Sequence, residues 1–175
     1  LADLTVVGTW QNGSGTPVFV GTDYLQDQNT GKGSKSVTFH PTVADAGTYE
    51  VSLWWTARSN RAASVPVDVI HADGTTTVMV NQQQGGSAWY SLCIYRFDPG
   101  KQGAVRVLND GTSGLVIADA IQLVSSVDTT PPVATLVTAG DGGSVVAAAL
   151  NSQGYLEIDF RDVGSGLDAA TVTDA

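Results

Sequence analysis

Apolar and polar side chains alternate along residues 47–55, and this alternation predicts a β-strand with one buried face. The two faces are Tyr49, Val51, Leu53 and Trp55 on the apolar side, and Glu50, Ser52 and Trp54 on the other side. Trp54 is a large aromatic side chain on the wetter face of this strand. It is therefore the first candidate for contact with a ligand.

The same period of two recurs along the first two thirds of the chain and predicts further strands. Residues 65–81 are the clearest case, because Asp73-Gly74 is a two-residue hairpin signal with β-branched residues alternating on both sides. The other predicted strands cover residues 4–10, 35–40, 89–97, 103–109 and 115–124. With 20 glycines and almost no stretch of helical period, the sequence indicates the all-β fold class.

The predicted strand at residues 89–97 has apolar side chains on both faces. Trp89, Cys93, Tyr95 and Phe97 share one face, and Leu92 and Ile94 share the other. This pattern is typical of a central strand that is buried on both sides. We expect Cys93, the only cysteine, to be a small buried hydrophobic residue, and no disulfide forms within the chain.

Two prolines divide the chain into a long and a short part. We predict a domain at residues 1–126, a linker at residues 127–132 and the N-terminal part of a second β-domain at residues 133–175. A basic start with a small-residue cleavage site is missing, so we expect an internal piece of a longer protein. No apolar run approaches the ~18 residues that span a bilayer, and we expect no membrane partner.

The net charge is −9, and it is concentrated in the second part of the chain. Residues 1–126 contain ten acidic and seven basic residues, whereas residues 127–175 contain seven acidic residues and one basic residue. Binding to a nucleic-acid duplex requires a basic surface that neutralises phosphates. The charge therefore excludes nucleic acid as the expected partner.

Several side chains that suit sugar binding cluster after Trp54 and in two other segments. Aromatic rings receive the CH faces of sugars, while amides and guanidinium groups bind hydroxyls and carboxylates. A run of four amides at residues 81–84 fits this chemistry, and it fits a solvated strand end equally well. The candidate ligand-binding residues are Trp54, Arg58, Asn60, Arg61, Tyr24, Gln82 and Gln83.

Asp119 falls on the same face as four aliphatic residues of the strand at 115–124, so its carboxylate needs a partner. Three interpretations remain open at this point. The carboxylate pairs with Arg58, Arg61 or loop amides, it binds a structural Ca²⁺ ion, or it contacts a ligand directly. The sequence contains no motif for a nucleophile, a catalytic metal or a nucleotide, so we expect a non-catalytic module.

Four segments in order resemble the golvesin/xanthan-lyase type of carbohydrate-binding-like domain. They are GTYEVSLWWTARSNRA, VIHADGTTTVMVNQQQ, WYSLCIYRF and VIADAIQL, and the resemblance covers residues 3–125. The family implies a jelly-roll-like β-sandwich in secreted bacterial proteins, often appended to polysaccharide lyases. Trp54 and Cys93 depart from its pattern, and Cys93 stands where glycine is usual. The matching positions are Trp55, Asn60, Arg61, His71, Asn81, Gln82, Gln83, Trp89 and Asp119.

Residues 128–175 resemble the start of a bacterial immunoglobulin-like spacer domain. The leading hypothesis is a polysaccharide-binding module of a larger secreted protein. The glycan is neutral or acidic; if it is acidic, Arg58 and Arg61 bind its carboxylates. The alternative is a structural spacer or adhesion module without a glycan ligand, in which both arginines are internal partners of Asp119. Their solvent exposure separates the two hypotheses.

Overall fold

The structure is a computed structural model that describes residues 3–16, 18–100, 102–126, 133–137, 144 and 157–161. The chain divides into two compact units, Leu1–Ser126 and Val127–Ala175. All regular secondary structure of the described residues is β-structure, and no helix among them is long and apolar enough to cross a membrane. The predicted all-β fold class is confirmed.

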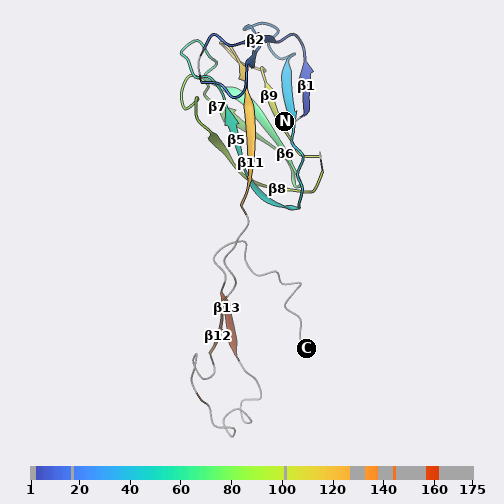
Figure 1. Cartoon of the computed structure of the whole chain (residues 1–175), viewed down its shortest axis with the longest axis vertical. Helices are drawn as coiled ribbons and strands as arrows, with labels where there is room; N and C mark the ends of the chain where they lie inside the picture. Colours follow the sequence, from blue (N-terminus) through green and yellow to red (C-terminus); the bar gives the residue numbers. More distant parts are fainter. Residues whose placement is uncertain are drawn as a thin grey trace. The chain divides into compact units, whose positions relative to one another are not determined.

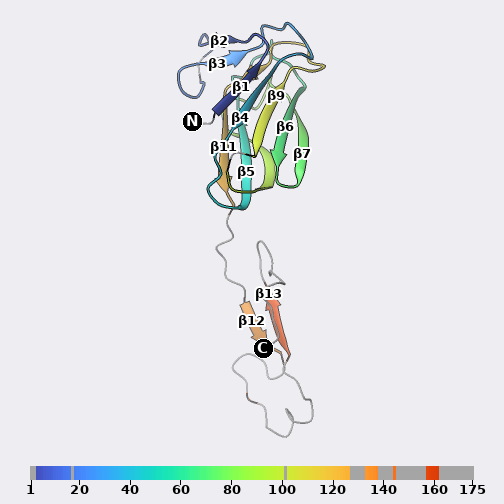
Figure 2. The same cartoon turned by 90° about the vertical axis from the view of Figure 1, so that its right-hand side faces the viewer.

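The first unit is a β-sandwich, and its larger layer is a five-stranded antiparallel sheet (Figures 1 and 2). The strand order is β1-β4-β9-β6-β7, so that β1 and β7 form the edges. The strands are β1 (Asp3–Val7), β4 (Ser36–His40), β9 (Ala104–Leu108), β6 (Val65–His71) and β7 (Gly74–Val80). The hairpin of β6 and β7 confirms the turn predicted from Asp73-Gly74.

A three-stranded sheet with β5 at its centre forms the opposite layer, and a second three-stranded sheet of short strands lies at one end of the unit (Figure 2). The central sheet has the order β11-β5-β8, with β11 (Ala120–Ser125), β5 (Gly47–Trp54) and β8 (Tyr90–Phe97). The short sheet contains β10 (Ile117–Ala118), β3 (Tyr24–Gln26) and β2 (Gln11–Gly13). Only Asp119 separates β10 from β11, so the chain changes sheets at this residue.

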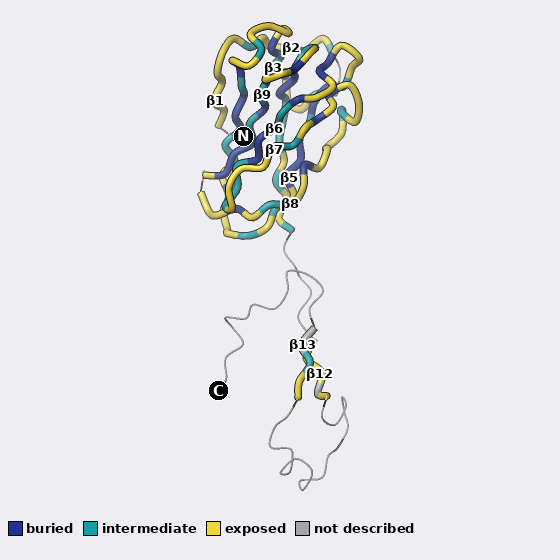
Figure 3. The backbone as a smooth tube through the Cα atoms, turned by 180° about the vertical axis from the view of Figure 1, so that it is seen from behind, coloured by how far each residue is buried: buried dark blue, intermediate teal, exposed yellow. Residues whose placement is uncertain are grey.

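The core lies between the layers, and Figure 3 shows its buried residues in the strand interiors. The alternation predicted for β5 is confirmed, because Val51, Leu53 and the following Trp55 are completely buried. The opposite layer contributes valines at alternate positions and one phenylalanine: Val37, Phe39, Val67, Val69, Val105 and Val107. In contrast, every residue of β1 is exposed.

The interpretation of β8 as a central strand is wrong, because β8 is an edge strand. Cys93 pairs with Val51, but the next residue of β5, Ser52, pairs with Ser91, so Leu92 is the extra residue of a β-bulge. The bulge reverses the alternation. Leu92 and Phe97 are buried, whereas Cys93 is exposed. A one-residue shift moves side chains to the other face, and a pattern of period two cannot reveal it.

We expect Cys93→Gly to raise the free energy of unfolding by about 1 kcal/mol. The backbone φ of Cys93 is 135°, a conformation that favours glycine because a Cβ atom is strained there. Urea unfolding of the wild type, Cys93→Gly and Cys93→Ala measures the effect. The alanine variant keeps the Cβ atom and should show no gain, so equal stabilisation by both substitutions would contradict the strain argument.

The described part of the second unit is a pair of antiparallel strands, β12 (Val133–Leu136) and β13 (Ile158–Arg161). Val133 pairs with Arg161 and Leu136 pairs with Ile158. The predicted linker at residues 127–132 lies outside the described residues. The immunoglobulin-like character of residues 133–175 stays a prediction.

Candidate functional site

Two tryptophan side chains meet at the surface near the end of β5 and the start of β8. The ring centroids of Trp54 and Trp89 lie 5.3 Å apart with an interplanar angle of 71°, an edge-to-face arrangement that aromatic pairs favour. Trp54 is half-buried and donates its indole Nε1–H to the carbonyl oxygen of Val18 at 3.2 Å. Trp89 is 40% exposed. The pair therefore presents chiefly the ring of Trp89 to solvent, with Trp54 as its support.

An apolar groove with a volume of about 360 Å³ opens beside this pair. Strands from both layers form it, and its lining residues are Leu4, Val20, Phe39, Trp89, Asp119, Ala120, Ile121 and Gln122. Asp119 is the one ionisable side chain in this lining. A smaller hollow of about 70 Å³ shares Leu4, Phe39 and Asp119 with the groove and adds Asp23. The geometry combines an aromatic ring, apolar walls and a carboxylate.

Asp119 lies where the chain passes from β10 to β11, and both of its carboxylate oxygens accept the backbone N–H of Val20, at 3.2 and 3.3 Å. Burial raises the pKa of Asp119 to about 6; the hydrogen bond from Val20 opposes this rise, and the nearby charge of Asp23 adds to it. The predicted contact with loop amides is confirmed. The predicted ties to Arg58 and Arg61 are wrong, because neither residue bonds to Asp119 among the described contacts.

Arg61 is 3% exposed and serves the interior of the fold, so its prediction as a ligand contact is corrected. It donates Nε–H to the carbonyl oxygen of Thr56 and Nη2–H to the hydroxyl of the same residue, both at 3.2 Å. Its guanidinium carbon lies 5.9 Å from the ring centroid of Tyr24. The guanidinium is thus paired with neutral acceptors and an aromatic face rather than with a carboxylate.

Tyr24 is also buried, at 5% exposure, and it borders the smaller hollow but not the main groove. The polar, glycine-rich segment at residues 21–35 contains β3, and this strand places the Tyr24 ring against the backbone of its partner, β2. A Cβ atom added to Gly13 would lie 2.5 Å from the ring, so only glycine allows this approach. The sequence showed a polar, glycine-rich segment, but not which strand it would join.

Gln82 fits neither interpretation of the amide run, because it is part of the interior of the fold. This residue is completely buried, donates Nε2–H to the carbonyl oxygen of Ile117 at 2.7 Å and accepts its N–H at 2.8 Å. Gln83 is exposed and donates Nε2–H to the carbonyl oxygen of Arg61 at 3.0 Å. The prediction that Gln82 contacts a ligand is therefore wrong, whereas ligand contact by Gln83 stays a prediction.

Arg58 and Asn60 are exposed, as sugar contacts must be. The side chain of Asn60 accepts a hydrogen bond from Arg61 at 3.1 Å. Neither residue lines the groove, and no described hydrogen bond or ring contact joins either of them to Trp54. The sequence predicted one cluster around Trp54, but the structure brings Trp54 together with Trp89 instead.

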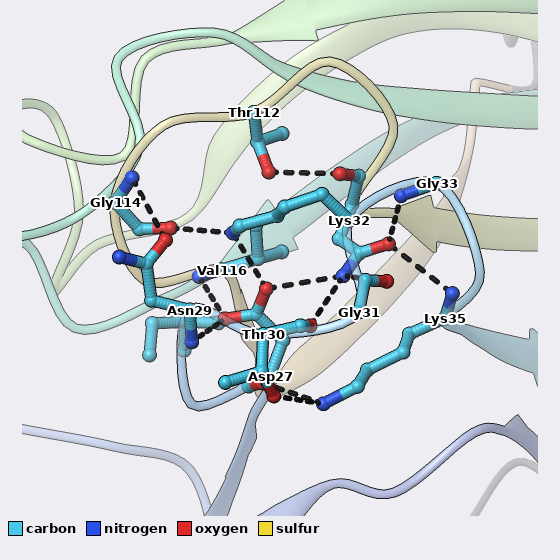
Figure 4. Close-up of polar contacts among 12 residues, drawn as sticks. Asp27, Asn29, Thr30, Gly31, Lys32, Gly33, Lys35, Thr112, Gly114 and Val116 are labelled. Carbon is cyan, nitrogen blue, oxygen red and sulfur yellow. Dashed lines mark hydrogen bonds and ion pairs between the residues drawn. The ribbon is translucent and has the colours of Figure 1, made fainter.

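A cluster of polar groups, here called the nest, connects the loops at residues 27–35 and 109–116 by hydrogen bonds (Figure 4). Two lysine ammonium groups lie within it. Lys32 Nζ donates to Asp27 Oδ2 and to the carbonyl oxygen of Gly114, both at 2.7 Å. Lys35 Nζ donates to the carbonyl oxygen of Asp27 at 2.7 Å and to the hydroxyl of Thr30 at 2.9 Å. The described residues contain no group of three or more His, Cys, Asp or Glu side chains placed to hold a metal ion.

Sequence reasoning did not identify Trp89 and the groove as candidates for the functional site. Trp89 matched the family motif, yet its strand face suggested packing rather than exposure. The one available signal was its position just after the Gly85-Gly86-Ser87-Ala88 segment, directly ahead of β8. The groove itself joins Leu4, Phe39 and Asp119, which are far apart in the sequence.

Comparison with solved structures places this fold among known proteins. A xanthan lyase from Paenibacillus is 49% identical, with a TM-score of 0.69, and the match covers 70% of this chain and 12% of that chain. A β-(1,4)-mannanase from Podospora anserina, whose description includes GH26-CBM35, has 14% identity and a TM-score of 0.55, with 73% of this chain and 29% of that chain covered. The second likeness shows the fold alone.

Sequence comparison gives a relative with the same name as the first structure. The xanthan lyase of Bacillus sp. (strain GL1) is 46% identical over 127 residues, which cover 71% of this chain. The chain spans only 14% of the length of that relative. The family described as the Golvesin C-terminal domain matches residues 2–125, and this chain belongs to that family.

Proposed function

We propose that this chain is a non-catalytic polysaccharide-binding module of a larger secreted bacterial protein that degrades polysaccharides. The Trp54–Trp89 pair and the adjacent groove form its binding site. The observation that carries the proposal is the exposed ring of Trp89 at an apolar groove that contains one carboxylate. This combination suits a sugar, which has apolar CH faces and hydroxyl donors.

The chemistry of each group supports the proposal. An indole ring offers a flat apolar surface on which a sugar ring stacks, and it retains a polar edge. The carboxylate of Asp119 accepts hydrogen bonds from hydroxyl groups, and a charged acceptor strengthens such bonds. Xanthan lyase, the relative at 46% identity, carries a polysaccharide in its name, and this supports the substrate class.

Trp89→Ala should weaken glycan binding by about tenfold, because the aromatic contact is lost and the rest of the groove remains. Affinity electrophoresis of the 175-residue chain through gels containing neutral and acidic polysaccharides, including xanthan, measures this effect. Met79→Ala is the matched control, since Met79 is 55% exposed on the edge strand β7 and does not line the groove.

Two results would contradict the proposal. If Trp89→Ala is retarded as strongly as the wild type, the site lies elsewhere on the unit. If the wild-type chain releases reducing sugars from a bound polysaccharide, the module is catalytic. The comparison with Trp89→Ala requires that retardation of Met79→Ala is unchanged. This control shows that truncating an exposed apolar side chain does not by itself alter migration.

The alternative function, a structural spacer or adhesion module without a glycan ligand, is favoured by one observation. Arg61 is buried and donates hydrogen bonds to Thr56 and Asn60, as an internal structural residue would. The same electrophoresis tests this alternative. Retardation of the folded wild type by none of the polysaccharides would support the spacer function and exclude the binding module.

A further inference from the structure

We propose that the groove selects glycan segments that carry no negative charge, an inference that rests on the proposed function. The ligand class is a neutral sugar segment with neighbouring hydroxyl groups, which donate to Asp119 while an apolar sugar face lies on Trp89. This selectivity is opposite to that of a site in which Arg58 and Arg61 bind the carboxylates of an acidic glycan.

The charge at the groove is negative. Asp119 is the one ionisable residue of the main groove, and the adjoining hollow adds the carboxylate of Asp23. No lysine or arginine of the described residues lines either space. A sugar carboxylate in the groove would therefore meet one or two like charges in a partly desolvated space, without a cation to neutralise it.

Five lysine and arginine side chains in the described part of this unit are engaged in contacts outside the groove. Arg61, Lys32 and Lys35 are engaged in the interior contacts described above. Arg96 forms ion pairs of 3.0 Å with Asp73 and with Asp98. Arg106 pairs with Asp68 in the five-stranded sheet. Arg58 is exposed, but it does not line the groove.

Asp119 retains acceptor capacity for a ligand. An ionised carboxylate has about four acceptor positions, and the described contacts use one donor, the N–H of Val20, which both oxygens share. The carboxylate borders both the groove and the smaller hollow. Hydroxyl groups of a bound sugar can donate to its remaining lone pairs, whereas a sugar carboxylate has no proton to donate at neutral pH.

A matched pair of polymers tests the inference: native xanthan, a carboxylated polysaccharide, and xanthan whose carboxyl groups have been reduced to alcohols. The full 175-residue chain is run through gels containing either polymer at pH 8, well above the Asp119 pKa of about 6. We expect the reduced polymer to give the same retardation as native xanthan at a concentration about fivefold lower. Added NaCl should narrow the difference, since salt screens repulsion.

Asp119→Asn removes the groove charge and keeps an oxygen to accept the N–H of Val20. This variant should be retarded more strongly by native xanthan than the wild type is. The concentrations of the two polymers that give equal retardation should then be nearly the same. Asp45→Asn is the matched control, because it removes an exposed charge outside the groove lining and should leave the ratio unchanged. The melting temperature of Asp119→Asn at pH 8 should be no lower than that of the wild type, since burial of its charge is unfavourable.

Two outcomes would overturn the charge selectivity while leaving glycan binding intact: native xanthan binds as tightly as the reduced polymer, or Asp119→Asn leaves their ratio unchanged. A third outcome is different in kind. If neither polymer nor any other polysaccharide of the panel retards the folded chain, the proposed function fails and the inference fails with it.

Discussion

Asp27→Asn should lower the free energy of unfolding at pH 7 by about 3 kcal/mol. Removing the charge of one partner of a buried ion pair leaves the charge of the other partner uncompensated. The side chain of Asp27 is completely buried, whereas that of its partner Lys32 is 27% exposed. This partial exposure of the ammonium group places the expected loss at the lower end of the range for buried pairs.

Each carboxylate oxygen of Asp27 has its own donors, and this explains why a neutral side chain of the same shape is a poor substitute. Oδ1 accepts the backbone N–H groups of Asn29 and Val116, both at 2.9 Å. Oδ2 accepts Lys32 Nζ at 2.7 Å and Asn109 Nδ2 at 3.2 Å. An asparagine would direct its NH₂ group at one of these donor pairs, so that N–H groups would face each other without an acceptor.

The stabilisation by Asp27 should disappear in acid. Burial raises the pKa of this carboxyl, but the hydrogen bonds from Lys32, Val116, Asn29 and Asn109 outweigh burial and hold the pKa below its ordinary range. A lowered pKa contributes stability that is present above the unfolded-state value of about 4 and is lost as the pH falls through the folded-state value. The difference between wild type and Asp27→Asn is therefore expected to shrink toward pH 2.

Urea unfolding at pH 7 and at pH 2 measures both effects. Asp110→Asn is the matched control, because Asp110 is an exposed aspartate of the neighbouring turn and its substitution should change the free energy by less than about 0.5 kcal/mol. Equal, small losses for both variants at pH 7 would show that the nest around Asp27 is not a source of stability.

The strands of the sandwich were predictable because their signals are local. Alternation identified the buried face of β5, and Asp73-Gly74 identified the turn between β6 and β7. Both features depend on residues that are neighbours in the sequence. The edge position of β8 was not predictable, because the bulge at Leu92 appears only in the pairing with β5.

The candidate site was less predictable because its parts are joined by distant pairing. Trp54 was identified from its strand face, but its partner Trp89 lies 35 positions later. The groove that Trp89 lines with residues of β1, β4 and β11 requires the completed sandwich. Arg61 resembled a ligand-binding side chain because it follows Trp54 closely. Its burial depends on contacts with Thr56 and Tyr24 that the sequence does not display.

Gly114→Ala should destabilise the first unit by about 3 kcal/mol or more, because two unfavourable effects coincide. Its φ is +102°, where a side chain is strained, and an added Cβ would lie 2.7 Å from the carbonyl oxygen of Arg61. That oxygen cannot move away easily, because Arg61 and Leu115 form a β-bridge and Ala62 N–H donates to the Leu115 carbonyl oxygen at 2.9 Å.

Gly111→Ala separates the two effects within the same loop. Gly111 also has a positive φ, +61°, but an added Cβ would have no atom within 4 Å, so only backbone strain of about 1 kcal/mol is expected. Thermal or urea unfolding of the two variants measures the difference. If both lose the same amount, the close approach of Gly114 to Arg61 contributes nothing. If Gly114→Ala loses far more, this contact fixes the loop that supplies the Gly114 carbonyl oxygen to Lys32, and the nest around Asp27 depends on it.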